Sequence, residues 1–141
     1  MKKKIEEMGL DHKIRIDSCG TSDYHIGEQP DDRTIRNALS NQVEINHRAR
    51  QFCREDLGSF HYILAMDSAN MSVVRQMDEA TEFAHKLHLM RDFDPLNQGE
   101  DVPDPYFGGQ EGFQHVFEII ERSVENFLNY VIDQHDLNVD Q

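Results

Sequence analysis

A continuous apolar run from His61 to Met66 constrains the fold of this chain more than any other feature. Strands inside a parallel sheet are covered on both faces, and they read as unbroken apolar segments rather than as an alternating pattern. Asp67 ends the run and is placed to cap the helix that follows it. The apolar positions of that helix are Met71, Val74 and Met77. A buried strand that leads directly into a helix indicates a parallel sheet covered by helices.

The N-terminal part of the chain continues this alternation of strands and helices. Residues Lys2 to Met8 are typical of the last turns of a helix that ends at Gly9. Lys13 to Asp17 have the alternating pattern of a short strand. A short helix is predicted to begin at Asp31 or Asp32. Its apolar face would contain Ile35, Ala38 and Leu39.

The C-terminal half contains the clearest helix signal. Leu87 to Met90 are a weaker strand candidate, and a loop rich in Asp, Pro and Gly is predicted from Phe93 to Gly112. Apolar residues then recur at helical spacing at Phe113, Val116, Phe117, Ile120, Val124, Phe127, Leu128 and Val131. We therefore expect one domain over residues 1–141, a three-layer α/β/α fold with a small parallel sheet.

Composition excludes several classes of protein. The chain has 141 residues and a formal net charge of −13. Nucleic-acid binding needs clustered Lys and Arg to neutralise phosphates, and Lys2 to Lys4 are the only basic cluster. No segment reaches the roughly 18 to 20 apolar residues of a membrane span. We expect neither a nucleic-acid partner nor a membrane partner.

The cysteines and histidines indicate no disulfide framework and no metal site. Cys19 and Cys53 are the only cysteines, and no secretory signal precedes the charged start. The expected compartment is a reducing cytoplasm. His85 and His88 lack the further ligands that a zinc site requires. We expect no metal and no other cofactor.

Three segments are placed where α/β folds bind ligands, beyond the carboxyl ends of parallel strands. The first is Asp17 to Ser22, followed by Tyr24 to Gly27. The second is Leu64 to Asn70, and the third is Val102 to Gly109. In this order and at these separations, with His47 to Gln51 and Arg54 to Asp56 between the first two, they resemble the low-molecular-weight protein tyrosine phosphatases.

The resemblance implies hydrolysis of a phosphate monoester in two steps, without a cofactor. In the family a cysteine thiolate attacks phosphorus, and water cleaves the resulting phosphocysteine. Backbone N–H groups and an arginine hold the thiolate at a low pKa. An aspartic acid protonates the leaving phenolate and then activates the water. The implied substrates are phosphotyrosine proteins or small aryl phosphates.

The resemblance assigns roles to particular residues. Asp104 would be the general acid, with a turn residue before proline as the plainer alternative. Tyr106 and Phe107 would form one wall of a slot for the phosphotyrosine ring, and Tyr24 part of the opposing wall. The alternative for these aromatic side chains is packing against the long helix.

Other residues would act behind the substrate site. Ser18 and His47 correspond to family residues that hold the shape of the phosphate loop, and Asp67 would stand behind the site while capping its helix. The plainer alternatives are a strand-end turn for Ser18 and a surface histidine for His47. Arg33 and Arg50 resemble structural ion-pairing residues, and Cys19 a small buried side chain.

The signature Cys-x5-Arg of the family does not occur in this sequence. The sixth residue after Cys19 is His25, and the sixth after Cys53 is Ser59. Compared with the family pattern, the chain is expected to lack the first central strand and the phosphate loop. It would then be truncated at its N-terminus and inactive. That strand would lie between Ile14–Ile16 and Tyr62–Met66.

The expected loss of this strand has one structural consequence, and two other interpretations of the chain stay open. Loss of a central strand would expose sheet edges and give a loosened monomer, a rearranged sheet or a homo-oligomer paired through those edges. The alternatives are a non-catalytic binding or regulatory module of the same fold and a relative of the arsenate reductases. The latter use further cysteines as a disulfide relay, which Cys19 and Cys53 do not supply.

Overall fold

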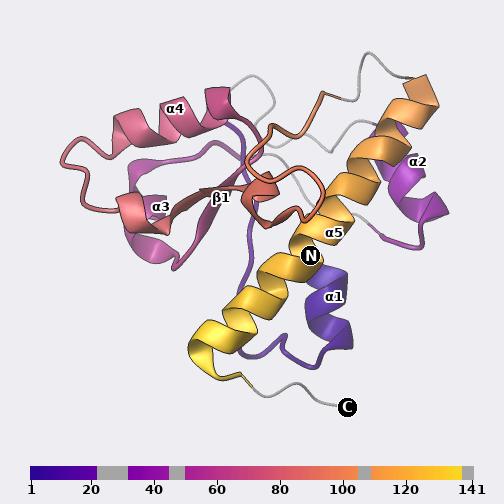
Figure 1. Ribbon diagram of the computed structural model, residues 1–141, viewed down its shortest axis with the longest axis horizontal. Coiled ribbons are helices and arrows are strands. Elements are labelled where there is room, and N and C mark those ends of the chain that lie inside the picture. The colour runs from indigo at the N-terminus through magenta and orange to yellow at the C-terminus, as the bar shows by residue number, and fades with distance from the viewer. Residues whose placement is uncertain (22–31, 45–49, 105–108, 138–141) are drawn as a thin grey trace.

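The computed structural model describes residues 1–21, 32–44, 50–104 and 109–137 (Figure 1). From β1 onward helices and strands alternate as the sequence predicts, whereas the three helices before β1 follow one another with no regular strand between them in the described residues. Their order is α1 (Lys2–Glu7), α2 (Asp32–Ser40), α3 (Arg54–Ser59), β1 (Ile63–Ala65), α4 (Ser68–Met77), the 3-10 helix η1 (Ala84–Lys86), β2 (Leu87–Leu89), the 3-10 helix η2 (Met90–Phe93) and α5 (Gly109–His135). Tyr24, His47, Tyr106 and Phe107 lie outside the described residues.

The sheet is parallel, as predicted. β1 pairs with β2, and Ile63 aligns with Leu87 while Ala65 aligns with Leu89. The two strands are joined through α4, the helical crossover that parallel neighbours require. A further parallel bridge joins Gly20 to Gln51. Within the described residues the regular part of the sheet consists of β1 and β2 alone.

The strand predicted from Lys13 to Asp17 is wrong. Lys13 lies in a turn, and residues 14–19 pair with no strand in the described part of the chain. Ladder-type bonds begin only at Gly20, whose N–H donates to the Arg50 carbonyl at 2.9 Å and whose carbonyl accepts from Phe52 N–H at 2.7 Å. An alternating pattern becomes a strand only where a neighbouring strand supplies hydrogen-bond partners.

The strand formed by the apolar run, β1, is shorter and less buried than predicted. β1 covers Ile63–Ala65, of which Ala65 is buried while Ile63 and Leu64 are half-buried. Met66, at the end of the run, is 38% exposed. Two short strands present little surface for helices to cover, so the ends of the run reach solvent.

The long helix at the C-terminus confirms the strongest periodic signal in the sequence. α5 contains the whole predicted apolar stripe, and it begins at Gly109, inside the segment predicted as a loop. Its fully buried side chains include Ile119 and Leu128. Figure 1 shows α5 running diagonally across the molecule, with α1 and α2 along it. None of the helices in the described residues has the length and apolar character needed to cross a bilayer.

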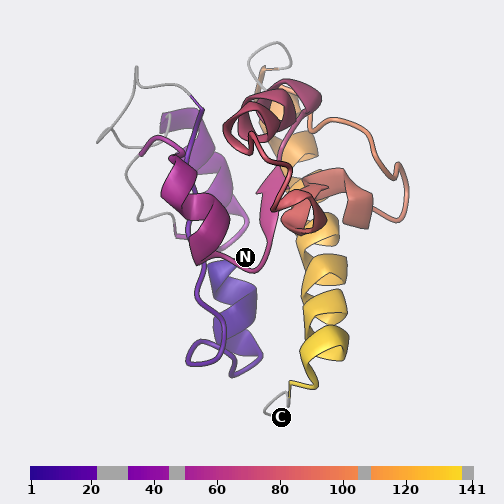
Figure 2. The same ribbon diagram turned by 90° about the vertical axis from the view of Figure 1, so that its left-hand side faces the viewer.

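Two hydrophobic clusters hold these elements together. The larger one packs Ile5 of α1 and Leu10 against Ile119 and Leu128 of α5. The smaller one packs Phe52, which precedes α3, and Leu57 of α3 against Val74 of α4. In Figure 2, α3 and α5 stand on opposite sides of the short sheet, so the layered α/β arrangement is visible.

Two of the shorter helices, α1 and α2, lie where the sequence predicts them. Gly9 follows the end of α1 with φ of 69°, a backbone conformation that favours glycine. α2 begins at Asp32, and Ala38 is buried. Leu39, predicted on the same apolar face, is instead 55% exposed. Because adjacent helical positions point about 100° apart, a helix with one covered stripe cannot bury both residues fully.

Candidate functional site

The first turn of α4 is where the three candidate ligand segments meet. Thr21, in the first segment, donates from Oγ1 to Oδ1 of Asn70 at 2.9 Å. Val102, at the start of the third segment, donates its N–H to the Met66 carbonyl at 2.8 Å. Asn70 and Met66 belong to the second segment. These contacts bring the segments together beyond the carboxyl end of β1, where α/β folds place ligands.

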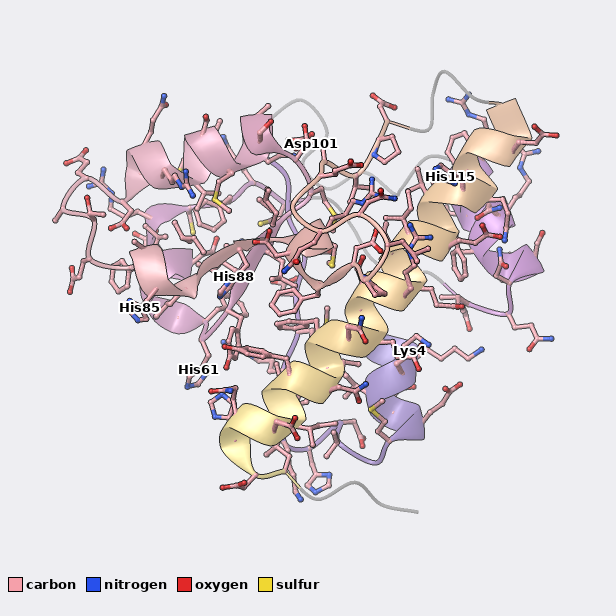
Figure 3. The ribbon with its side chains drawn as sticks, viewed as in Figure 1. Lys4, His61, His85, His88, Asp101 and His115 are labelled. Carbon is pink, nitrogen blue, oxygen red and sulfur yellow. The ribbon has the colours of Figure 1, made fainter. Side chains whose placement is uncertain are left out.

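Two carboxylates bind backbone N–H groups at the start of α4. Oδ1 of Asp67 accepts from the Asn70 N–H at 2.7 Å, which confirms the predicted helix cap. Asp101 accepts from the Ser68 N–H at 2.8 Å and from the Ser68 hydroxyl at 3.1 Å. Figure 3 shows Asp101 beside this end of the helix. Negative charge is favourable there because the helix dipole is positive at its N-terminus.

Arg50 ties the first segment to α3. Its Nε donates to Oδ2 of Asp17 at 2.8 Å, and its Nη1 and Nη2 donate to the two carboxylate oxygens of Asp56 at 3.0 and 3.1 Å. The predicted structural ion pairing of Arg50 is confirmed. Arg33 has its guanidinium over the ring of Phe113, 5.1 Å from the centroid.

The electrostatics of this ion-pair cluster favour its charged form. Burial alone would raise the pKa of Asp56, but hydrogen bonds from Arg50 and from the Cys53 N–H outweigh it and hold the pKa below its usual range. The hydrogen bond to Asp56 is the largest cause that raises the pKa of Arg50. α3 was not predicted from the sequence. Its signal is the spacing of Cys53 and Asp56, since the carboxylate reaches back to the Cys53 N–H at 2.9 Å.

Comparison with known proteins assigns the chain to a family. A family profile described as "Low molecular weight phosphotyrosine protein phosphatase" matches residues 1–137. The chain belongs to this phosphatase family. A relative from Synechocystis sp. is 40% identical over 128 residues, which cover 91% of this chain and 82% of that protein. The low molecular weight protein-tyrosine-phosphatase of Streptomyces coelicolor is 33% identical over 133 residues, with 93% and 81% covered.

A solved structure of the same phosphatase family confirms the predicted fold. The crystal structure of a protein tyrosine phosphatase from Entamoeba histolytica with Hepes in the active site matches with a TM-score of 0.86 at 32% identity. The match covers 96% of this chain and 86% of that one. The phosphatase-like α/β fold with a small parallel sheet is therefore established for this chain.

Two of the residues to which the phosphatase resemblance gives a role in the site are exposed. Asp104 is exposed and lies two residues after Val102, which is 9% exposed and packs in the larger hydrophobic cluster. Ser18 is exposed, and its N–H donates to Oδ1 of Asp17 at 2.8 Å. Asp17 also binds Arg50, so Ser18 adjoins the ion-pair cluster. The role of Asp104 as general acid and that of Ser18 in holding the shape of the phosphate loop stay predictions.

Neither cysteine has the environment of a phosphatase nucleophile. Cys19 is exposed, so the prediction of a buried side chain is wrong. It directly precedes Gly20, which forms a bridge with Gln51, and it lies outside the core. Partial desolvation by the surrounding chain nevertheless raises the pKa of its thiol, against an opposing effect of Arg50. Desolvation and then the carboxylates of Glu55 and Asp56 raise the pKa of Cys53. A nucleophilic thiol needs the opposite shift.

Asp101 and Arg91 belong to the candidate site but were not predicted from the sequence. Arg91 donates from Nη1 to the Asp101 carbonyl at 3.0 Å. The loop that contains Asp101 was recognisable as rich in Asp, but no spacing distinguishes this residue from Asp92 or Asp94. Among the residues that the structure describes, no group of three or more His, Cys, Asp or Glu side chains is arranged to hold a metal ion.

Proposed function

We propose that this chain carries the acid-base and aryl-binding part of a protein-tyrosine phosphatase active site, within one domain over residues 1–141. The observation that carries the proposal is the attachment of the segment before Asp104 to the first turn of α4, beside Thr21, in a chain of this family. The reaction is hydrolysis of a phosphate monoester, by way of a phosphocysteine. Its substrates are phosphotyrosine proteins or small aryl phosphates.

Asp104 is the residue to which we assign proton transfer. As a carboxylic acid it would protonate the phenolate when the phosphorus–oxygen bond breaks, and as a carboxylate it would take a proton from the attacking water. Exposure supports this role, since the group must exchange its proton with solvent between turnovers. The flanking Pro105 and Tyr106 are those of the family motif.

The remaining site residues would bind the ring and hold the loops. Tyr106, Phe107 and Tyr24 would enclose the aryl group, because aromatic walls favour a flat apolar ring. Ser18 and His47 would hold the phosphate loop in shape, and Asp67 keeps Asn70 oriented at the start of α4. No cofactor and no nucleic acid enters this reaction, and the net charge of −13 argues against phosphate-backbone binding. The two free cysteines fit a reducing compartment such as the cytoplasm.

We further propose that these 141 residues by themselves have no phosphatase activity. Its sequence contains no Cys-x5-Arg segment, and both of its thiols have raised pKa values. Without a thiolate there is no group for Asp104 to assist. An assay with p-nitrophenyl phosphate and with a phosphotyrosine peptide should give no turnover above a protein-free blank. Turnover that rises with protein concentration would contradict this proposal.

The role of Asp104 is tested in a fusion that supplies an apolar strand and a Cys-x5-Arg loop ahead of Met1. The fusion should hydrolyse p-nitrophenyl phosphate, and Asp104→Asn should lower its kcat by about 10²- to 10⁴-fold, the usual contribution of a general acid. Asp133→Asn is the matched control, because Asp133 is an exposed aspartate near the end of α5. An active fusion whose kcat is unchanged by Asp104→Asn would remove Asp104 from the mechanism. A fusion that folds but stays inactive would favour a non-catalytic binding module.

A further inference from the structure

The segment immediately before Asp104 is held by four hydrogen bonds to other elements. The carboxylate of Asp101 accepts from the Ser68 N–H at 2.8 Å and from the Ser68 hydroxyl at 3.1 Å. The Val102 N–H donates to the Met66 carbonyl at 2.8 Å. The Asp101 carbonyl accepts from Nη1 of Arg91 at 3.0 Å. Backbone and side chain of this segment are therefore both bonded to the surrounding fold.

The guanidinium of Arg91 is also hydrogen-bonded to a buried carboxylate. It is 5% exposed, and its Nε donates to Oδ2 of Asp94 at 2.9 Å. Asp94 is 1% exposed and also accepts two hydrogen bonds from Arg122 of α5. A buried guanidinium between two acceptors has one favourable orientation, because each unpaired donor would cost free energy. The Asp101 carbonyl is thus linked through Arg91 and Asp94 to the long helix.

These contacts limit where Asp104 can lie. Three residues of fully extended chain span at most about 10 to 11 Å, so the Cα of Asp104 stays within that reach of the Cα of Asp101. Val102 reduces the freedom further, because its side chain is buried in the larger hydrophobic cluster and its N–H is bonded to Met66. Only Pro103 separates Val102 from Asp104, and proline fixes its own φ near −65°.

We propose that Asp101 and Arg91 are positioning residues for Asp104: they hold the start of its loop on α4 and α5 so that the carboxyl group is aligned before substrate binds. The inference rests on the proposed role of Asp104 as general acid. A group held in position before the reaction avoids the entropy cost of being ordered during it. Neither Asp101 nor Arg91 is proposed to contact the substrate.

A purely structural role for Asp101 would be to complete the capping of α4. Asp67 already supplies the cap through the Asn70 N–H, and the first helical bond of α4 runs from the Met71 N–H to the Asp67 carbonyl at 3.0 Å. The two roles therefore affect different amides. If Asp101 mainly caps α4, its loss lets the first turn fray and breaks the bond of the Met71 N–H to Asp67. If Asp101 holds the loop, its loss lets the loop move away and breaks the bond of the Val102 N–H to Met66.

Amide hydrogen exchange measured by NMR on the whole 141-residue chain separates these roles. In Asp101→Ala we expect exchange of the Val102 amide to rise by about tenfold or more, while that of Met71 changes by less than about threefold. The carboxyl ¹³C resonance of Asp104 should shift in the same variant. Asp101→Asn keeps an oxygen that can accept from Ser68 and should restore most of the protection. Glu100→Gln is the matched control, since it removes an adjacent exposed carboxylate whose closest approach to Arg91 is 3.5 Å.

Two results would overturn the inference. One is a Val102 amide that exchanges equally fast in the Asp101→Ala variant and in the Glu100→Gln control. The other is an equal rise at Val102, Met71 and the core amide of Leu128, which would show a loss of global stability instead of a local release. Failure of the proposed function is a separate outcome: it is seen in the kcat of the fusion with Asp104→Asn and leaves these exchange rates unaffected.

Discussion

Arg122 donates two hydrogen bonds to the carboxylate of Asp94, from Nε to Oδ1 at 2.8 Å and from Nη2 to Oδ2 at 3.1 Å. Arg91 adds a third, to Oδ2 at 2.9 Å. Removing the charge of Asp94 would leave two guanidinium groups facing each other around a neutral side chain. We expect Asp94→Asn to lower the free energy of unfolding by about 3 to 5 kcal/mol, the usual cost of breaking a buried ion pair.

Urea titration followed by circular dichroism measures this loss directly. Asp136→Asn is a suitable control, because Asp136 is exposed just beyond the end of α5. An unfolding midpoint for Asp94→Asn within error of the control would mean that the three hydrogen bonds contribute nothing to stability.

The same carboxylate should make stability depend on pH. Hydrogen bonds from Arg122, the largest cause, together with those from the Leu96 N–H and Arg91, outweigh burial and hold the pKa of Asp94 far below its usual range. The group therefore contributes stability that is fully present above the unfolded pKa of about 3.9 and is lost as pH falls through that value toward the native pKa. Urea midpoints measured from about pH 7 down to about pH 3 should fall more steeply in the wild type than in Asp94→Asn. Parallel slopes would assign the acid sensitivity to other carboxylates.

Arg50 should be worth more to stability than an exposed arginine of the same region. It binds both Asp17 and Asp56, and Asp56 is 7% exposed, so Arg50→Ala leaves a buried carboxylate with one fewer partner. We expect a loss of about 1 to 3 kcal/mol in the free energy of unfolding. Arg54→Ala is the matched control: Arg54 pairs with Glu79 at the surface, and such pairs contribute less than about 1 kcal/mol. Equal losses in the two variants would show that the bidentate geometry has no particular value.

The sequence predicts α1, α2, α4 and α5, because each of these helix signals lies within a few neighbouring residues, whereas it did not predict α3. Asp67 and the apolar positions after it define α4, and the stripe from Phe113 to Val131 defines most of α5. Strands are less local. Lys13 to Asp17 alternates as a strand should, but pairing depends on another segment of the chain, and the structure shows partners only from Gly20 onward. Propensity cannot reveal whether such a partner exists.

Contacts of the candidate site were likewise predictable only where the two residues are close in sequence. The cap at Asp67 was predictable, since the Asn70 N–H that it binds is three residues away. The bond from Ser68 to Asp101 joins residues 33 apart, and the bond from Thr21 to Asn70 joins residues 49 apart. Contacts of that range leave no spacing pattern in one sequence. The resemblance to a family supplied Asp104, whereas Asp101 emerged only from the three-dimensional arrangement.

The free edge of β1 should promote self-association. Among the described residues β1 pairs with β2 on one side, and no strand pairs with its other side. An edge of unpaired N–H and C=O groups is a template for a strand of another chain. We expect the sedimentation coefficient to increase over an approximately hundredfold range of protein concentration, as mass action requires for a reversible homo-oligomer.

A charge placed at the end of β1 should weaken that association. Met66 follows β1 and is 38% exposed, so Met66→Lys should add repulsion at the edge with little cost to the core. Leu39→Lys is the matched control, because Leu39 is an exposed apolar residue of α2, which lies apart from β1 in Figure 1. We expect Met66→Lys to raise the dissociation constant and Leu39→Lys to leave it unchanged. A sedimentation coefficient that is constant at all concentrations, or an equal effect of both substitutions, would rule out association through the edge of β1.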